Sequence, residues 1–203
     1  MLCLRHLAVV PLTVFVVSVA ACDAHTGAAP PTASGPAVTS VAGESTSDLD
    51  VFARLPKTFT FSSGTTWFTD VEIAADGSFD GSFYDSEVSE GGPGYPSGTV
   101  YESTFSGRFD VTRKVSEDEY ELELVEFQIE GTVGDERIDD EIRYVTQEPH
   151  GFDDAHFFAL YPPGTGTSVL PEDVRRWLPR TDNSALARWC LYNISGGSPF
   201  FGY

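Results

Sequence analysis

The chain has 203 residues and a formal net charge of −19 at pH 7, with 31 Asp and Glu against 12 Lys and Arg. This excess of acid excludes a nucleic-acid-binding protein, because such proteins need clustered Lys and Arg to contact phosphates. It also excludes a surface that rests on anionic lipid headgroups, which attract basic segments. Aromatic residues make up 13% of the chain, more than a disordered chain carries, so we expect a folded domain.

The first residues have the features of a secretion signal. Arg5 gives a short basic start, and residues 7–19 form an apolar run too short to span a membrane. The run ends in Val19-Ala20-Ala21-Cys22, which resembles the lipobox of bacterial lipoproteins. The resemblance implies that residues 1–21 are removed and that lipid on Cys22 anchors the protein to the extracytoplasmic face of the cell membrane. The alternative is an ordinary signal peptide cut nearby, beside a coincidental Cys.

Residues 22–47 are expected to form the lipidated Cys and a flexible tether. Of the 25 residues from 23 to 47, 20 are Ala, Thr, Ser, Gly or Pro, and none is aromatic, Leu or Ile, so this stretch cannot pack a core. The acidic domain then covers residues 48–203. Its one remaining thiol, Cys190, lies in an apolar stretch, which favours a buried, inert side chain and leaves no partner for an internal disulfide.

Alternation of apolar and polar residues with a period of two dominates this domain. It predicts strands around residues 59–61, 67–73, 79–83, 101–105, 109–115, 119–129, 138–144, 157–161 and 189–194. Ala75-Asp76-Gly77 has the composition of a hairpin turn. The stretch 157–161 is apolar on both of its faces, so we expect it to be covered on both.

One strand changes the parity of its apolar face. Tyr120, Leu122 and Leu124 occupy even positions, whereas Phe127 and Ile129 occupy odd positions. An extra residue in the strand would produce this change, so the sequence predicts a β-bulge at residues 124–126. The alternative is that one strand ends there and another begins.

The sequence predicts one short helix late in the chain. Pro171 opens it, acids follow in its first turn, Arg175 and Arg176 lie in its last, and Pro179 ends it. The expected fold is therefore all-β and antiparallel, with about eight or nine strands in a closed or nearly closed barrel. A two-sheet sandwich is the alternative.

A pattern F-x-G-x-F occurs twice, at residues 79–83 and 105–109. Gly within a strand often marks a bend or the close approach of another backbone or aromatic ring. We interpret the two copies as a structural feature of the barrel and as support for a layout of paired hairpins.

Several side chains are candidates for ligand binding. Trp67, Tyr84 and Tyr101 would line a pocket if the barrel were hollow, and Tyr95 lies in the Gly- and Pro-rich loop of residues 85–98. Carboxylates in this loop, and the cluster of His and Asp in residues 150–156, match no metal-binding motif, so no metal or cofactor is expected.

Arg113 and Asp140 fall on the apolar parity of their expected strands. A charge that faces the interior is costly unless it is paired. We expect these two side chains either to form a buried ion pair or to provide a polar anchor inside a ligand cavity.

Most of residues 57–203 resemble a group of uncharacterised bacterial lipoproteins. The resemblance rests on residues 76–83, 94–101 and 105–109 and on the aromatic, Gly-rich end at residues 192–203. That group has no assigned activity, so the resemblance implies no site. A likeness to lipocalin-like barrels is an analogy of fold only.

The first functional hypothesis is a membrane-anchored module that binds a small ligand or an envelope protein. The alternatives are a structural envelope protein without a ligand and an acidic cation-binding protein. We expect no enzyme, because the sequence holds no nucleophile elbow, Walker loop, CxxC pair or HExxH.

Overall fold

The computed structural model describes residues 50–178 and 184–203. The predicted leader, lipidation site and tether, and Pro179 after the helix, lie outside these residues. The described elements are η1 (Phe52–Arg54), β1 (Phe59–Ser62), β2 (Trp67–Ile73), β3 (Ser78–Glu87), β4 (Thr99–Ser116), β5 (Glu119–Ile129), β6 (Glu136–Asp139), β7 (Ile142–Thr146), β8 (Phe157–Tyr161), α1 (Glu172–Trp177), β9 (Cys190–Asn193) and β10 (Ser198–Gly202).

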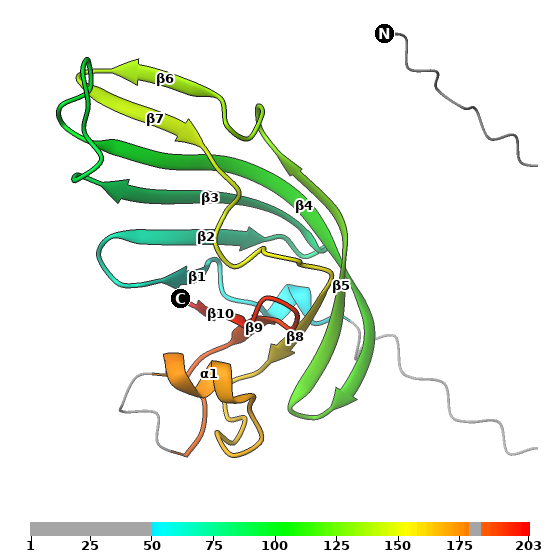
Figure 1. Ribbon diagram of the computed structural model, residues 1–203. Coiled ribbons are helices and arrows are strands. Elements are labelled where there is room, and N and C mark those ends of the chain that lie inside the picture. Colours follow the sequence, from blue (N-terminus) through cyan, green and yellow to red (C-terminus); the bar gives the residue numbers. More distant parts are fainter. Residues whose placement is uncertain (1–49, 179–183) are drawn as a thin grey trace, which may run out of the picture. The chain divides into compact units, whose positions relative to one another are not determined.

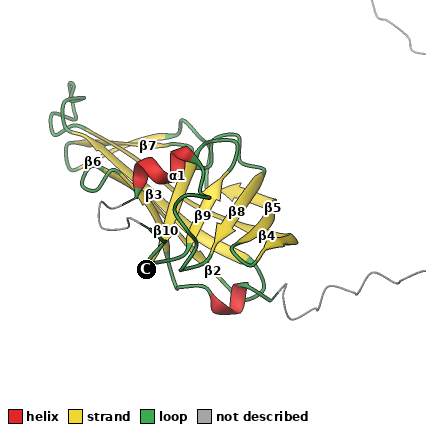
Figure 2. Ribbon diagram, turned by 90° about the horizontal axis from the view of Figure 1, so that it is seen from below, coloured by secondary structure: helices red, strands yellow, loops and turns green. Residues whose placement is uncertain are grey.

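The strands form a closed barrel with a two-stranded extension. They follow the order β3-β2-β1-β10-β9-β8-β5-β4-β7-β6, and an additional pairing of β3 with β4 closes the first eight. All pairings are antiparallel except that of β4 with β7. Figures 1 and 2 show the long, curved β4 and β5, with β8, β9 and β10 on another side of the barrel. The predicted all-β barrel is therefore confirmed. None of the described helices has the length and apolar character needed to span a membrane.

The long strand β4 corrects the expected layout of paired hairpins. Residues 101–105 and 109–115 belong to one strand, Thr99–Ser116. Its first part pairs with β7 on one edge, and its later part pairs with β5 on that same edge, while residues 99–108 pair with β3 on the other. This exchange of neighbours lets the β6–β7 extension leave the barrel (Figure 1).

The two F-x-G-x-F copies lie side by side on β3 and β4. Phe79 is opposite Gly107, and Gly81 is opposite Phe105. A Cβ on Gly107 would lie 2.5 Å from the Phe79 ring, and a Cβ on Gly81 would meet the Phe105 ring. Each glycine therefore makes room for the aromatic ring of the other copy, which is the close approach that the sequence predicted.

The predicted bulge lies at Val125. Arg108 is opposite Glu126, whereas Phe109 is opposite Leu124, so Val125 has no partner in the register. The unpaired residue lets Leu124 and Phe127 both pack against the core cluster or its aromatic rings. The prediction at residues 124–126 is confirmed.

A second irregularity shows that the expectation for Arg113 was wrong. Val111 is opposite Leu122 and Arg113 is opposite Glu121, so Thr112 is an extra residue in β4. This residue reverses the parity of the strand. The Arg113 side chain is therefore 60% exposed and donates a 2.9 Å hydrogen bond to Glu121, whose pKa it lowers.

The expectation of one strand across residues 138–144 was also wrong. Asp139 pairs with Ile142, and the two residues between them, Asp140 and Glu141, have φ values of 46° and 65°. A two-residue hairpin turn requires this left-handed backbone. Asp140 is therefore an exposed turn residue and forms no buried pair with Arg113.

The predicted helix and the two-sided cover of β8 are both confirmed. Helix α1 covers residues Glu172–Trp177 and buries Val174. Phe158 and Leu160 of β8 face the main core, whereas Ala159 and Tyr161 pack in a second cluster with Val174. This cluster also contains Cys190, which is fully buried, and burial raises the pKa of its thiol. The sequence analysis did not predict β10, which follows the expected last strand at residues 189–194.

The barrel interior is filled by aromatic side chains, and one of them comes from a loop. Residues 147–156, here called the strap, connect β7 to β8 and cross in front of β3 and β4 (Figure 1). Phe152 of the strap is 8% exposed and contacts five rings of the barrel: Phe79, Phe105, Phe127, Phe158 and Phe200. The core is therefore completed by a segment that is not part of the sheet.

Candidate functional site

The most distinctive surface feature is a pair of outward aromatic rings on neighbouring strands. Phe68 of β2 is opposite Tyr84 of β3, and their rings stack with centroids 5.7 Å apart and planes inclined by 20°. Thr69, which follows Phe68, and Phe83, which precedes Tyr84, are buried, whereas Phe68 and Tyr84 are each 38% exposed. Successive side chains of a strand point to opposite faces, so the pair lies on the outside of the barrel.

This pair lines a groove of about 480 Å³, here called the aromatic groove. Its polar walls come from Glu102 and Thr104 of β4, Glu130 after β5, and Thr146 of β7. The strand register places Phe68, Tyr84, Glu102 and Thr146 in one row across four strands. The groove therefore combines apolar rings with carboxylates and hydroxyls on a rigid sheet, as ligand sites commonly do.

The two carboxylates of the aromatic groove differ in their partners. Glu102 accepts a hydrogen bond of 2.7 Å from Nη2 of Arg137. Glu130 accepts one of 2.7 Å from the hydroxyl of Thr104. Among the described residues, no basic side chain lies within ion-pair distance of Glu130. The groove thus carries a carboxylate whose charge is not neutralised.

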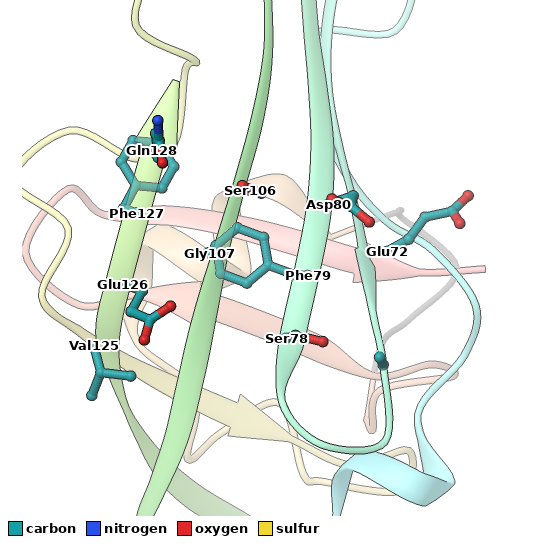
Figure 3. Close-up of a pocket in the computed structure, with 11 residues that line it drawn as sticks. Glu72, Ser78, Phe79, Asp80, Ser106, Gly107, Val125, Glu126, Phe127 and Gln128 are labelled. Carbon is teal, nitrogen blue, oxygen red and sulfur yellow. The ribbon is translucent and has the colours of Figure 1, made fainter. Parts of the chain in front are cut away.

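A larger hollow of about 680 Å³, here called the acidic groove, crosses β2, β3, β4 and β5. Glu72 and Asp80 line one side, and Glu126 lines the other (Figure 3). Figure 3 also shows the ring of Phe79 beside Gly107, where the F-x-G-x-F copies meet. Acidic side chains on a solvated strand face keep a protein soluble, and no other feature here indicates a ligand.

Three predicted aromatic residues do not gather at one site. Trp67 packs against the core with its ring 5.1 Å from that of His150. The hydroxyl of Tyr101 donates a 2.6 Å hydrogen bond to Glu90, which raises the pKa of Tyr101. Tyr95 lies under the guanidinium of Arg143, at 5.0 Å. Only Tyr84 of the predicted residues lines the aromatic groove.

The His and Asp cluster of the strap is dispersed. His150 lies 3.6 Å from Asp85, and His156 lies 4.0 Å from Glu123. Asp153 instead accepts a backbone hydrogen bond from Gly151. In residues 50–178 and 184–203, no group of three His, Cys, Asp or Glu side chains is arranged to hold a metal ion.

Sequence reasoning missed most of the groove, although one signal was present. Phe68 occupies the polar parity of its strand, between Trp67 and Thr69. A single apolar residue on a polar face is common, but an apolar patch there indicates an interaction site, and Phe68 forms such a patch with Tyr84 on the neighbouring strand. Glu130 and Thr146 gave no such signal, because only the pairing of β4 with its neighbours brings them to Tyr84.

Comparisons with known proteins found no match to this chain among family models, curated proteins or solved structures.

Proposed function

We propose that this protein is a lipid-anchored binding module on the extracytoplasmic face of a membrane, with the aromatic groove as its ligand site. The observation that carries the proposal is the exposed, stacked pair of Phe68 and Tyr84 in a groove of about 480 Å³. Exposed apolar surface rimmed by polar groups is typical of interaction sites. The filled interior supports an external site, because aromatic rings occupy the space that an internal ligand would need.

The membrane anchor rests on the residues before the domain. Val19-Ala20-Ala21-Cys22 resembles a lipobox, and the composition of residues 23–47 suits a flexible tether. A tether of this length has an end-to-end distance of roughly 25–30 Å. It would hold the aromatic groove above the membrane and let the domain turn toward a ligand.

Changing Cys22→Ser is expected to abolish attachment of fatty acid and to move the protein from the membrane fraction to the soluble fraction. The measurement is metabolic labelling with a clickable fatty acid, followed by fractionation. Cys3→Ser is the matched control and should keep both the label and the membrane location, because Cys3 lies in the expected leader. Label that persists in the Cys22→Ser protein would contradict the anchor.

The binding module is tested by thermal melts of the full-length protein in detergent with lipids, glycans, peptides and small apolar compounds. A ligand at 100 times its Kd adds about 2.7 kcal/mol, which raises Tm by about 2–4 °C per kcal/mol in a domain of this size. Phe68→Ala with Tyr84→Ala should remove that rise. Phe157→Ala, at a Phe with the same exposed fraction of 38%, should keep it. A rise that survives loss of both rings would place the ligand elsewhere.

The filled barrel also favours a second candidate, a structural envelope protein that needs no small ligand. The core is completed by the protein's own strap, through Phe152, so the fold has no vacancy for a ligand to stabilise. Crosslinking on intact cells distinguishes the candidates. A crosslinked partner whose yield does not change in the Phe68→Ala, Tyr84→Ala protein, together with no ligand-dependent melt, would support the structural role.

A further inference from the structure

Beside the aromatic groove, the protein's own Arg137 side chain shows how this surface holds a guanidinium. The Arg137 guanidinium lies 3.8 Å from the centroid of the Tyr144 ring, and its Nη2 lies 2.7 Å from Glu102. An aromatic ring and a carboxylate together hold this cation, one through its π face and the other through charge and hydrogen bonding. This arrangement shows, within the molecule, which chemistry the outer sheet face accommodates.

The aromatic groove repeats the same set of groups without the cation. Tyr84, stacked on Phe68, supplies the rings, and Glu130 supplies a carboxylate held in place by Thr104. In the part of the chain that the structure describes, no cation lies over Tyr84. The two sets are neighbours, because Tyr84 is opposite Glu102 in the sheet.

We infer that the aromatic groove binds an extended, arginine-containing peptide segment of a basic partner protein, with one guanidinium against Tyr84 and Phe68 and paired with Glu130. This inference rests on the proposed function of the groove. A guanidinium both stacks on aromatic rings and donates hydrogen bonds to a carboxylate, whereas a quaternary ammonium cannot donate to Glu130. A neutral ligand that covered Glu130 would remove this exposed carboxylate from water without supplying an opposite charge.

Charge and shape favour a peptide as the occupant. The chain carries a net charge of −19, which attracts a basic partner over a distance and speeds its association. Thr146 also lines a second hollow of about 310 Å³, whose other lining residues are Asp135, Glu136, Arg137 and Tyr144. An extended chain advances about 3.3 Å per residue, so a few residues would reach from Tyr84 to these acids.

The test is fluorescence polarisation with the full-length protein in nonionic detergent and a fluorescein-labelled Gly-Arg-Gly-Arg-Gly peptide. Glu130→Gln and Tyr84→Leu are each expected to weaken binding at least about tenfold, equivalent to about 1.4 kcal/mol. Glu117→Gln removes the same charge from a side chain that is 91% exposed at the turn between β4 and β5, and should change the affinity less than about twofold. The peptide with citrulline in place of arginine should bind at least about tenfold more weakly.

Two results of the peptide assay would overturn the inference. One is an equal loss of affinity in Glu130→Gln and Glu117→Gln, which would mean diffuse attraction to an acidic protein. The other is equal binding of the arginine and citrulline peptides. A neutral oligosaccharide that binds in a Tyr84-dependent manner would contradict a peptide as the ligand, but it would still support the aromatic groove as the binding site. If no compound binds in a Tyr84-dependent manner, the proposed function fails as well.

Discussion

Replacing Phe152 with alanine is expected to lower the free energy of unfolding by about 3–5 kcal/mol, the range for Phe→Ala in a packed core. The ring is 8% exposed and stacks on Phe127 at 4.9 Å, with planes inclined by 13°. Removing it would open a cavity among rings from β3, β4, β8 and β10, which cannot all move inward to fill it. Because domains of this size have about 5–15 kcal/mol of stability, this loss is a large share of the total.

The measurement is urea unfolding of the full-length protein in detergent, followed by tryptophan fluorescence. Phe152→Leu keeps most of the volume and should cost about 1–2 kcal/mol, so the series remains measurable if the alanine variant does not fold. Phe157→Ala is the matched control, because that ring is 38% exposed, and it should cost less than about 1 kcal/mol. A loss below about 1.5 kcal/mol for Phe152→Ala would show that the strap is not an essential part of the core.

Asn193→Ala is expected to cost about 3–5 kcal/mol, because it removes four hydrogen bonds between a fully buried side chain and the backbone. Asn193 is fully buried. Its Nδ2 donates to the carbonyl oxygens of Gly151 and Asp153 at 3.0 and 2.9 Å. Its Oδ1 accepts from the backbone N–H groups of Ser195 and Gly196, both at 3.1 Å. One amide therefore joins the strap to the β9–β10 turn.

Two measurements test the role of Asn193. Urea unfolding gives the loss of stability, with Ser63→Ala as a control that should cost less than about 0.5 kcal/mol, since the Ser63 hydroxyl bonds Thr66 in an exposed pair. Limited proteolysis should cut the strap faster in Asn193→Ala than in wild type, because the strap has lost its attachment. The double variant with Phe152→Ala should lose less than the sum of the two single losses, since both act on the same segment. Additive losses would mean that the amide and the ring act independently.

Features that depend on local pattern could be predicted from the amino-acid sequence alone. Alternation gave the β class, and Asp76-Gly77 gave the first hairpin turn, where Gly77 has a φ of 84°. The change of parity placed the bulge at Val125, because the alternation of strand side chains counts every inserted residue. Proline and charge placement gave α1. These signals are carried by residues close together in the chain.

Predictions from local pattern were wrong where an irregularity in a strand was not visible in the spacing of its apolar residues. The extra residue Thr112 moved Arg113 to the outer face, and the turn at Asp140 and Glu141 split an expected strand. The apolar residues beside these sites include Val115 and Ile138, which are themselves exposed, so their parity does not mark a buried face. An acidic hairpin turn built without glycine also lacks the usual composition of such turns.

The core and the candidate site depend on contacts between residues far apart in the chain, so they became visible only in the folded structure. Phe152 lies in a loop, so its burial depends on rings contributed by β3, β4, β5, β8 and β10. The aromatic groove joins Phe68 to Thr146 across four strands, and the parallel pairing of β4 with β7 fixes its far wall. Pairing between distant strands is chosen by how the whole barrel closes, and no segment of the sequence carries that information on its own.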